Sequence, residues 1–348
     1  MKRQEQSKNK LIFVGFSFWH HGKHSGYDYI RNVVSYDMIF ECQKAINYFH
    51  SIPERKNVFA KLYLILFKDR PWWVELRVIF HLLFYKDLTF HFIYPENMFN
   101  YSGFFKGKRN RIICTFHQPP SSYELKLNYF RSSKYIDSII VLSQDMLAPI
   151  RNLFPSSRVL YLPHGVDTTY FRPLNNSNRD KSVLLVGNWL RNFSFANETI
   201  QRLLQFNSEV VINVVTNKSN FHYFIKDDRM NLFSGIDDDH LLHLYQTSGV
   251  LFLPLIGFTA NNALLEGAAC GCKIIIATDQ DNRSCYIEEK YIDIIPFDAN
   301  LGAKRILARL YEQNNEREKS MVEFVRANYN WELIGARIEA ELRETVRD

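Results

Sequence analysis

Short apolar segments alternate with helical stretches along almost the whole chain, and this rhythm constrains the fold more than any other feature. In the first half the strand-like segments are Leu11–Phe16, Leu88–Tyr94, Arg111–Phe116, Ile136–Leu142 and Arg158–Leu162. In the second half they are Ser182–Val186, Val210–Val215, Val250–Leu255, Lys273–Ala277 and Ile292–Pro296. Strands that alternate with helices form parallel sheets covered by helices on both faces. The sequence therefore predicts an α/β protein.

The helical stretches complete the pattern and suggest two domains. Helical periodicity predicts helices at Tyr27–Ile39, Ser121–Tyr135, Phe195–Leu204, Asp238–Thr247, Asn261–Ala269 and Leu301–Glu312. The polar segment Arg172–Asp180 lacks periodicity and predicts a linker. The 348 residues are enough for two domains of about 150 residues each. We expect two Rossmann-like domains facing each other across a cleft, with ligands bound beyond the carboxyl ends of the strands.

Composition and cysteine content indicate the compartment. No apolar run reaches the ~18 residues needed to span a bilayer. The basic, polar start of the chain lacks the apolar core of a signal peptide. The five cysteines form no CxxC pair, so neither a disulfide framework nor a zinc site is expected; they are Cys42, Cys114, Cys270, Cys272 and Cys285. We expect a cytoplasmic protein.

Charge is distributed unevenly along the chain. Residues 1–165 hold 23 Lys and Arg against 12 Asp and Glu, whereas residues 166–348 hold 20 against 25. The first part therefore carries the positive charge behind the net value of +6. Such asymmetry predicts that the first part meets a polyanionic surface or partner, either a membrane or a nucleic acid.

One segment that follows a predicted strand has the features of a phosphate site. The strand ends at Pro254, and a helix opens near Thr259–Asn262. Unpaired backbone N–H groups and the positive end of the helix dipole suit a phosphate there. Glu266 lies about one turn into the helix, within reach of sugar hydroxyls. Taken alone, the segment is equally consistent with an ordinary capped helix and a solvated glutamate.

Several motifs in order along the chain sharpen this interpretation. They are Leu162-Pro-His-Gly-Val-Asp167 with Tyr170-Phe-Arg-Pro173, Leu185-Val-Gly-Asn-Trp-Leu-Arg191, and Leu264-Leu-Glu-Gly-Ala-Ala-Cys-Gly271. Together they resemble the family-4 glycosyltransferases, which are retaining enzymes of the GT-B fold. The likeness also includes the loop Gly22–Gly26, the segment Thr115–Pro120 and the segment Asn330–Ile334.

The resemblance implies a division of labour within the chain. Residues 1–165 would bind the acceptor, and residues 166–330 would bind the nucleotide sugar. A C-terminal helix over 331–348 would pack back on the first domain. The resemblance implies no cofactor and no metal. His20, His21 and His24 crowd one loop, but no carboxylate or cysteine lies near them in the sequence, so we expect no metal there.

The resemblance also implies roles for individual residues. Glu266 would hold the ribose of the nucleotide through charge-assisted hydrogen bonds. Arg191 would neutralise the leaving diphosphate, with a surface salt bridge as the alternative role of that residue. His117 would line the reaction centre, although a lone histidine is often structural. The remaining expected donor-binding residues are Gly22, Gly26, Asn188, Thr259, Ala260, Asn261 and Asn262.

Two positions depart from the family pattern. The first of the family's two glutamates, which contacts the transferred sugar, corresponds to Phe258. The phosphate-binding arginine that follows Gly187 in the family is replaced by Asn188, and Arg191 is the expected substitute. These departures leave the donor sugar, and activity itself, open.

Residues 55–90 interleave basic and aromatic side chains. Such a stretch is typical of an amphipathic helix in the lipid interface, anchored by tryptophan and by anionic headgroups. The residues expected to contact the membrane are Lys61, Lys68, Arg70, Trp72 and Trp73. Many of these rings would equally suit a core beneath a solvated basic face. Single-strand nucleic-acid binders share the pattern, but no nucleic-acid motif accompanies it, so we expect no nucleic-acid partner.

The combined expectation is a retaining glycosyltransferase, peripheral on the cytoplasmic face of the membrane. It would move a sugar from a nucleotide diphosphate sugar to a lipid-linked glycan in bacterial surface polysaccharide or lipopolysaccharide synthesis. Three alternatives stay open: a sugar-nucleotide 2-epimerase, a phosphorylase-like enzyme, and an inactive homologue that acts as a binding or scaffold subunit. The epimerase would need carboxylates and a histidine as acid and base, and the phosphorylase would need a pyridoxal-binding lysine.

Overall fold

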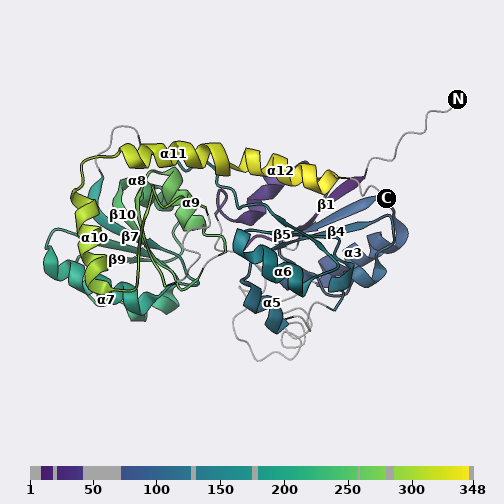
Figure 1. Cartoon of the computed structure of the whole chain (residues 1–348), viewed down its shortest axis with the longest axis horizontal. Helices are drawn as coiled ribbons and strands as arrows, with labels where there is room; N and C mark the ends of the chain where they lie inside the picture. Colours follow the sequence, from purple (N-terminus) through teal and green to yellow (C-terminus); the bar gives the residue numbers. More distant parts are fainter. Residues whose placement is uncertain are drawn as a thin grey trace. The chain divides into compact units, whose positions relative to one another are not determined.

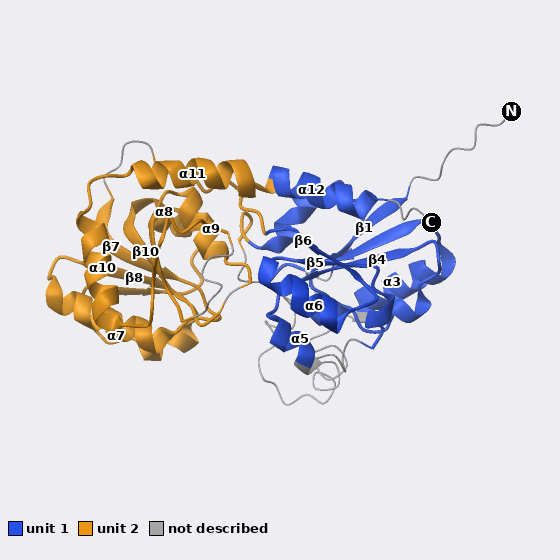
Figure 2. Cartoon of the chain, in the orientation of Figure 1, with its two compact units in different colours: residues 1–21, 26–163, 332–348 blue, residues 22–25, 164–331 orange. Residues whose placement is uncertain are grey.

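The computed structural model describes residues 9–18, 22–41, 72–126, 131–174, 179–257, 259–279 and 286–344. The chain forms two compact units (Figure 2). Unit 1 comprises Met1–His21, Gly26–Pro163 and Glu332–Asp348. Unit 2 comprises Gly22–Ser25 and His164–Trp331, so the short loop Gly22–Ser25 groups with the second half of the chain.

Unit 1 is built on a six-stranded parallel sheet in the order β2-β1-β3-β4-β5-β6. The strands are β1 Lys10–Gly15, β2 Met38–Glu41, β3 Leu88–Phe92, β4 Arg111–Phe116, β5 Ser138–Val141 and β6 Arg158–Tyr161. Its α-helices are α3 Trp72–Phe84, α4 Pro95–Met98, α5 Pro120–Lys126, α6 Leu147–Leu153 and α12 Trp331–Arg343. Its 3-10 helices are η1 Tyr27–Asn32, η2 Ser102–Phe105, η3 Ser133–Tyr135 and η4 Gln144–Met146.

Unit 2 repeats the design with a second parallel sheet in the order β12-β11-β10-β7-β8-β9. The strands are β7 Asp180–Val186, β8 Val211–Val215, β9 Met230–Phe233, β10 Ser248–Pro254, β11 Lys273–Ala277 and β12 Asp293–Ile295. The helices are α7 Phe193–Phe206, η5 Lys218–Tyr223, α8 Asp238–Thr247, α9 Asn262–Ala269, α10 Ala299–Tyr311 and α11 Glu316–Tyr329 (Figure 1).

The expected α/β class with two Rossmann-like units is confirmed, and all ten expected strands are present. The helix expected over Tyr27–Ile39 is wrong in its second part, since η1 ends at Asn32 and β2 follows. Aromatic and branched residues favour the strand there, and Phe40 is fully buried in it. The single helix expected over Ser121–Tyr135 is wrong at its end, because Ser133–Tyr135 forms the 3-10 helix η3; residues 127–130 lie outside the described part of the chain.

In unit 2 the helices after strands start at side-chain caps. The caps of α7, α8, α9 and α10 are Asn192, Asp237, Asn261 and Asp298, and each accepts a hydrogen bond from the backbone N–H three residues later. Such caps satisfy backbone donors that the helix leaves unpaired. Helix α9 also lies very close to β10, since a Cβ at Gly267 would come within 2.3 Å of the Leu251 side chain. Caps and close packing therefore fix where α9 begins.

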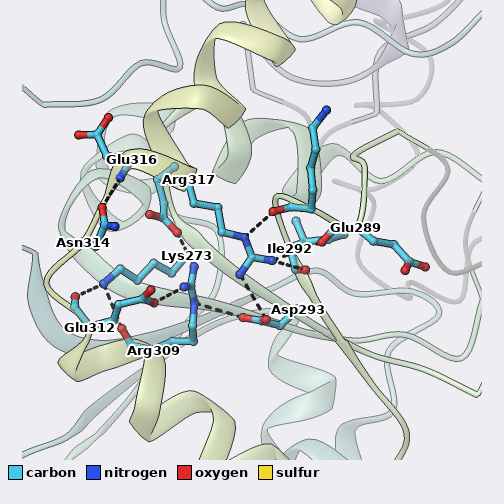
Figure 3. Close-up of polar contacts among 11 residues, drawn as sticks. Lys273, Glu289, Ile292, Asp293, Arg309, Glu312, Asn314, Glu316 and Arg317 are labelled. Atoms are coloured by element: carbon cyan, nitrogen blue, oxygen red, sulfur yellow. Dashed lines mark hydrogen bonds and ion pairs between the residues drawn. The ribbon is translucent and has the colours of Figure 1, made fainter.

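A buried polar network fastens α10 and α11 to the edge of this sheet (Figure 3). The Arg309 guanidinium pairs with Glu318 and Glu312 and lies 3.1 Å from the Asp293 carboxylate. Arg309 and Glu318 are both buried. The Lys273 ammonium donates to the Arg309 carbonyl at 3.1 Å, and burial lowers its pKa. Buried charges need such partners, so the network fixes one arrangement of strands and helices.

Candidate functional site

The strand order of unit 2 points to one place for a ligand. The chain runs from β7 to β8 and β9 on one side and then returns to β10, β11 and β12 on the other. The order therefore reverses between β7 and β10, which are paired in parallel. Open parallel sheets bind ligands beyond the carboxyl ends of the strands at such a reversal. The loops that follow these two strands are residues 187–192 and 255–261.

The two loops are held together by backbone contacts. Arg191 and Leu255 form an antiparallel bridge. The backbone N–H of Asn192 donates to Pro254 O at 2.9 Å, and that of Ile256 donates to Leu190 O at 3.2 Å. Leu190 adopts a left-handed conformation with φ of 54° to make this turn. The pairing places Arg191 next to the start of α9.

The Arg191 guanidinium is fixed by three acceptors. Its Nε donates to Val186 O at 3.1 Å and its Nη1 to Trp189 O at 3.2 Å. Its Nη2 donates to the side-chain oxygen of Asn261 at 3.3 Å. Gly187 has φ of 127°, and a Cβ on it would come within 2.7 Å of the guanidinium. Burial lowers the pKa of Arg191 to about 10, so the group stays cationic at neutral pH.

Asn261 connects this cation to the helix and has one unused donor. Its Oδ1 caps α9 by accepting from the N–H of Leu264 at 3.2 Å. Its side chain is only 4% exposed. Its Nδ2 is buried and has no hydrogen-bond partner among the described residues. An unsatisfied buried donor is costly and calls for an explanation. An anion at the N-terminus of α9 would supply the missing acceptor.

Glu266, one turn into α9, is also buried and fully engaged. Its Oε2 accepts from the Tyr245 hydroxyl at 2.9 Å, and its Oε1 accepts from Ser25 Oγ at 2.6 Å. Burial, followed by the charge of Glu266, raises the pKa of Tyr245 well above its ordinary value, so the hydroxyl keeps its proton and donates. The carboxylate thus sits among hydroxyl donors, which is the environment that a sugar diol would provide.

The loop Gly22–Ser25 makes further contacts within unit 2. The N–H of Lys23 donates to Asp238 Oδ2 at 2.6 Å. His24 Nδ1 lies 2.8 Å from Asp167 Oδ2, and the His24 ring stacks on Tyr170 with centroids 3.7 Å apart. The sequence pattern singled out Gly22 in this loop and Gly26 directly after it, but it missed Ser25. The signal available for Asp167 was its place at the end of the His-Gly-Val-Asp motif.

The other expected donor-binding residues fall into two groups. Thr259 and Ala260 directly precede the cap of α9, and Asn262 is its first residue, so these lie with Asn261 and Arg191. Asn188 contacts the loop after β8, because its Oδ1 accepts from Thr216 Oγ1 at 3.1 Å and from Asn217 N–H at 2.6 Å. Its side-chain oxygen therefore holds the end of β8. Phe258 lies outside the described residues.

Unit 1 has its own polar group at the carboxyl edge of its sheet, where strand order reverses between β1 and β3. His117 follows β4; its N–H donates to Glu96 Oε1 at 2.9 Å, and its Nε2 donates to Ile93 O at 2.6 Å. The carbonyl can only accept, so Nε2 carries the proton and Nδ1 is the basic nitrogen of the neutral ring.

Two residues that the sequence pattern did not single out lie at the same edge. The ring of Tyr94 packs against that of His117, with their centroids 4.7 Å apart. The Tyr94 hydroxyl is buried without a partner among the described residues. The buried carboxylate of Asp28 accepts from Ser17 Oγ at 2.5 Å. Burial, followed by the charge of Asp28, raises the pKa of Tyr94. A histidine, a phenol and a carboxylate thus gather in unit 1.

Of the expected membrane-contacting residues, Lys61, Lys68 and Arg70 lie outside the described part of the chain, and Trp72 begins α3. Trp73 is 65% exposed. The same face of α3 also exposes Leu76, Phe80, Leu83 and Phe84. The opposite face buries Val74, Val78 and Leu82. The helix therefore presents apolar side chains on two faces, one in the core and one outside it.

No helix among the described residues is both long and apolar enough to cross a bilayer. No three His, Cys, Asp or Glu side chains come together in that part of the chain as metal ligands. His20 and His21 lie outside it.

The sequence matches no protein-family model, and no curated protein is detectably similar to it. Solved structures are similar in fold. Sucrose-phosphate synthase from Thermosynechococcus elongatus has a TM-score of 0.68 at 17% identity, over 96% of this chain and 98% of that one. A glycosyltransferase from Rickettsia africae has 0.66 at 12% identity, over 98% and 100%.

An α,α-trehalose-phosphate synthase from Burkholderia xenovorans has a TM-score of 0.67 at 12% identity, over 96% of this chain and all 100% of that one. At such low identity these likenesses establish the fold alone. The chain has the GT-B fold of glycosyltransferases, with two Rossmann-like units.

Proposed function

We propose that this chain is a retaining glycosyltransferase that transfers a hexosyl group from a nucleotide diphosphate sugar. The observation that carries the proposal is the buried, unpartnered Nδ2 of Asn261 beside the Arg191 guanidinium at the N-terminus of α9. A helix end, a cation and an unused amide donor together suit a diphosphate. The GT-B fold supports a nucleotide sugar as the source of that diphosphate.

The residues of unit 2 have distinct tasks in this proposal. Arg191, Asn261 and the first N–H groups of α9 bind the diphosphate, and Glu266 accepts hydrogen bonds from the ribose. As the bond between the anomeric carbon and the phosphate oxygen breaks, negative charge grows on the leaving diphosphate. Arg191 and the helix end stabilise that charge, so the step needs no metal ion.

The acceptor completes the reaction on the same face of the sugar. Its oxygen bonds to the anomeric carbon, and its proton passes to the leaving phosphate, so no protein nucleophile is required. The polar group of unit 1, with His117 held between the rings of Tyr27 and Tyr94, is the proposed place for the acceptor hydroxyl. Comparison supports a sugar acceptor, since the Burkholderia enzyme was solved with glucose-6-phosphate.

We further propose that the acceptor is a lipid-linked glycan of bacterial surface polysaccharide or lipopolysaccharide synthesis. The exposed apolar face of α3 and the positive charge of residues 1–165 support docking on the anionic cytoplasmic face of a membrane. Aromatic residues at such a helix suit the lipid interface. The protein would then meet its acceptor at the bilayer surface.

An inactive homologue that binds without turnover is the second candidate. It is favoured by Asn188, whose side-chain oxygen holds Thr216 and Asn217 where the family places a phosphate-binding arginine. Release of a nucleoside diphosphate from a nucleotide sugar separates the two candidates, because only the enzyme releases it.

The proposed donor site is tested by thermal unfolding of the purified chain with UDP, GDP, ADP, CMP or dTDP in excess. A ligand at ~100 times its dissociation constant stabilises the folded state by roughly 2.7 kcal/mol. We expect one diphosphate to raise the unfolding temperature more than the others. If none of the five raises it at millimolar concentration, the donor site is refuted.

A further inference from the structure

Both carboxylate oxygens of Glu266 are occupied by hydroxyl groups of the chain itself. Tyr245 donates to Oε2 at 2.9 Å from within the core, where its side chain is fully buried. Ser25 donates to Oε1 at 2.6 Å from the loop Gly22–Ser25. Glu266 is 5% exposed, so little of the carboxylate is left to solvent. A ribose that forms hydrogen bonds with this carboxylate therefore competes with a hydroxyl group of the chain that is already bonded to it.

The loop is anchored to unit 2 residue by residue. The Lys23 N–H binds Asp238 at 2.6 Å, His24 lies 2.8 Å from Asp167, and Ser25 binds Glu266. A Cβ at Gly22 would come within 1.5 Å of the Asp238 carboxylate oxygen, so a larger residue there would displace the Asp238 side chain. Three consecutive residues therefore each contact a different acidic side chain. These contacts hold the loop in the position in which the Ser25 hydroxyl donates to Glu266.

The chemistry of the contact matches that of a sugar. A serine hydroxyl and a ribose hydroxyl are the same kind of donor, and each makes a charge-assisted bond to a carboxylate. Tyr245 reaches Glu266 from the buried side, so Ser25 is the donor that a ligand can replace. We propose that Ser25 Oγ occupies the place of a ribose hydroxyl on Glu266, so that nucleotide binding must displace it and Ser25 sets the affinity of the donor site.

This inference rests on the proposed function, because it takes the Glu266 site to bind a nucleotide. Its consequence is quantitative. When only the open form of a site binds ligand, the apparent affinity falls by the fraction of molecules that are open. Removing the Ser25 hydroxyl with Ser25→Ala should therefore tighten ribonucleotide binding roughly tenfold, the size expected for one hydrogen bond to a charged group.

A ligand without ribose hydroxyls provides the diagnostic comparison. A 2′,3′-dideoxynucleotide has no hydroxyl to place on Glu266 and no need to displace Ser25. Its affinity should therefore be the same in the parent and in Ser25→Ala. The matched control variant is Thr169→Ala, which removes a 2.6 Å hydroxyl bond to the Asp167 carboxylate and leaves Glu266 untouched.

The experiment is calorimetric titration of the parent and both variants with UDP, GDP and ADP and with their 2′,3′-dideoxy forms. Thermal unfolding without ligand first checks that each variant is folded. The inference predicts tighter binding of the ribonucleotide in Ser25→Ala only, with dideoxy affinities unchanged. Ribonucleotide affinity that is equal or weaker in Ser25→Ala overturns it. If neither the parent nor Ser25→Ala binds any ribonucleotide, the donor site itself, and with it the proposed function, is refuted.

Discussion

The Arg191 guanidinium donates to the side-chain oxygen of Asn261 at 3.3 Å, although the two residues are 70 positions apart. The same oxygen caps α9, so one amide joins a fixed cation to a helix N-terminus. The Nδ2 of that amide is buried and has no hydrogen-bond partner among the described residues. This relationship is the physical basis for the proposed diphosphate site.

His117→Ala should lower turnover by roughly 100-fold while leaving nucleotide affinity near that of the parent, because the ring belongs to unit 1 and the proposed diphosphate and ribose contacts belong to unit 2. Nucleoside diphosphate release and calorimetric affinity measure the two effects. Tyr94→Phe is the comparison variant at the neighbouring ring. The hydroxyl that it removes has no partner among the described residues, so the unfolding temperature of this variant should not fall below that of the parent. Normal turnover in His117→Ala would assign the histidine a structural role.

Trp73→Ala/Phe80→Ala should weaken co-sedimentation with vesicles that contain anionic lipid, since both side chains are exposed on one face of α3. Neither the parent nor the variant should sediment with neutral vesicles, because the basic residues are attracted only to anionic lipid. Phe206→Ala, which alters an exposed ring in unit 2, is the control. Equal sedimentation of parent and double variant with anionic vesicles would remove α3 from the proposed membrane surface.

Glu318→Gln should lower the free energy of unfolding by about 3 kcal/mol, because it leaves the buried Arg309 charge with weaker compensation. The matched control on the same helix is Glu323→Gln, which breaks an exposed pair with Arg326 and should cost less than about 1 kcal/mol. Urea unfolding of both variants measures the difference. Similar costs for the two substitutions would show that the network in Figure 3 is not a stabilising element of unit 2.

His91 should make the protein sensitive to acid. It is fully buried, with the Tyr36 hydroxyl at 2.7 Å and Thr115 Oγ1 at 2.8 Å, and burial lowers its pKa to about 3. The unfolded chain, with a histidine pKa of about 6.5, binds a proton that the folded chain excludes. The contribution of His91 to the free energy of unfolding is therefore fully present above about pH 6.5. It is lost as the pH falls toward about 3, by up to roughly 1.4 kcal/mol per pH unit.

The measurement is urea unfolding from about pH 7 to about pH 4 for the parent and for His91→Gln, which cannot titrate. The slope of unfolding free energy against pH should be smaller in the variant. His222→Gln, at an exposed position, should keep the parent slope. An unchanged slope in His91→Gln would show that other groups control the acid response.

The sequence predicted the architecture well because the strands that build both sheets are short, apolar and bounded by polar loops. It missed β2 and β9, which have four residues each and too little alternation to stand out. Arg191 and Asn261 were reached through local motifs and a family likeness. Ser25 was missed because its contact with Glu266 spans 241 positions, and no local pattern reports such a pairing. Tyr94 was missed because an unpartnered hydroxyl is a property of packing.

The most direct test of the diphosphate site is calorimetric titration of Asn261→Asp with the nucleoside diphosphate that most stabilises the parent. Aspartate is an equally good helix cap, so the variant should keep the parent's unfolding temperature. It replaces the Nδ2 donor with a second negatively charged oxygen, which would repel a phosphate. We predict affinity at least about tenfold weaker than in the parent, equivalent to the loss of about 1.4 kcal/mol. A folded Asn261→Asp variant that binds the nucleotide as tightly as the parent would show that the Asn261 amide does not bind the diphosphate.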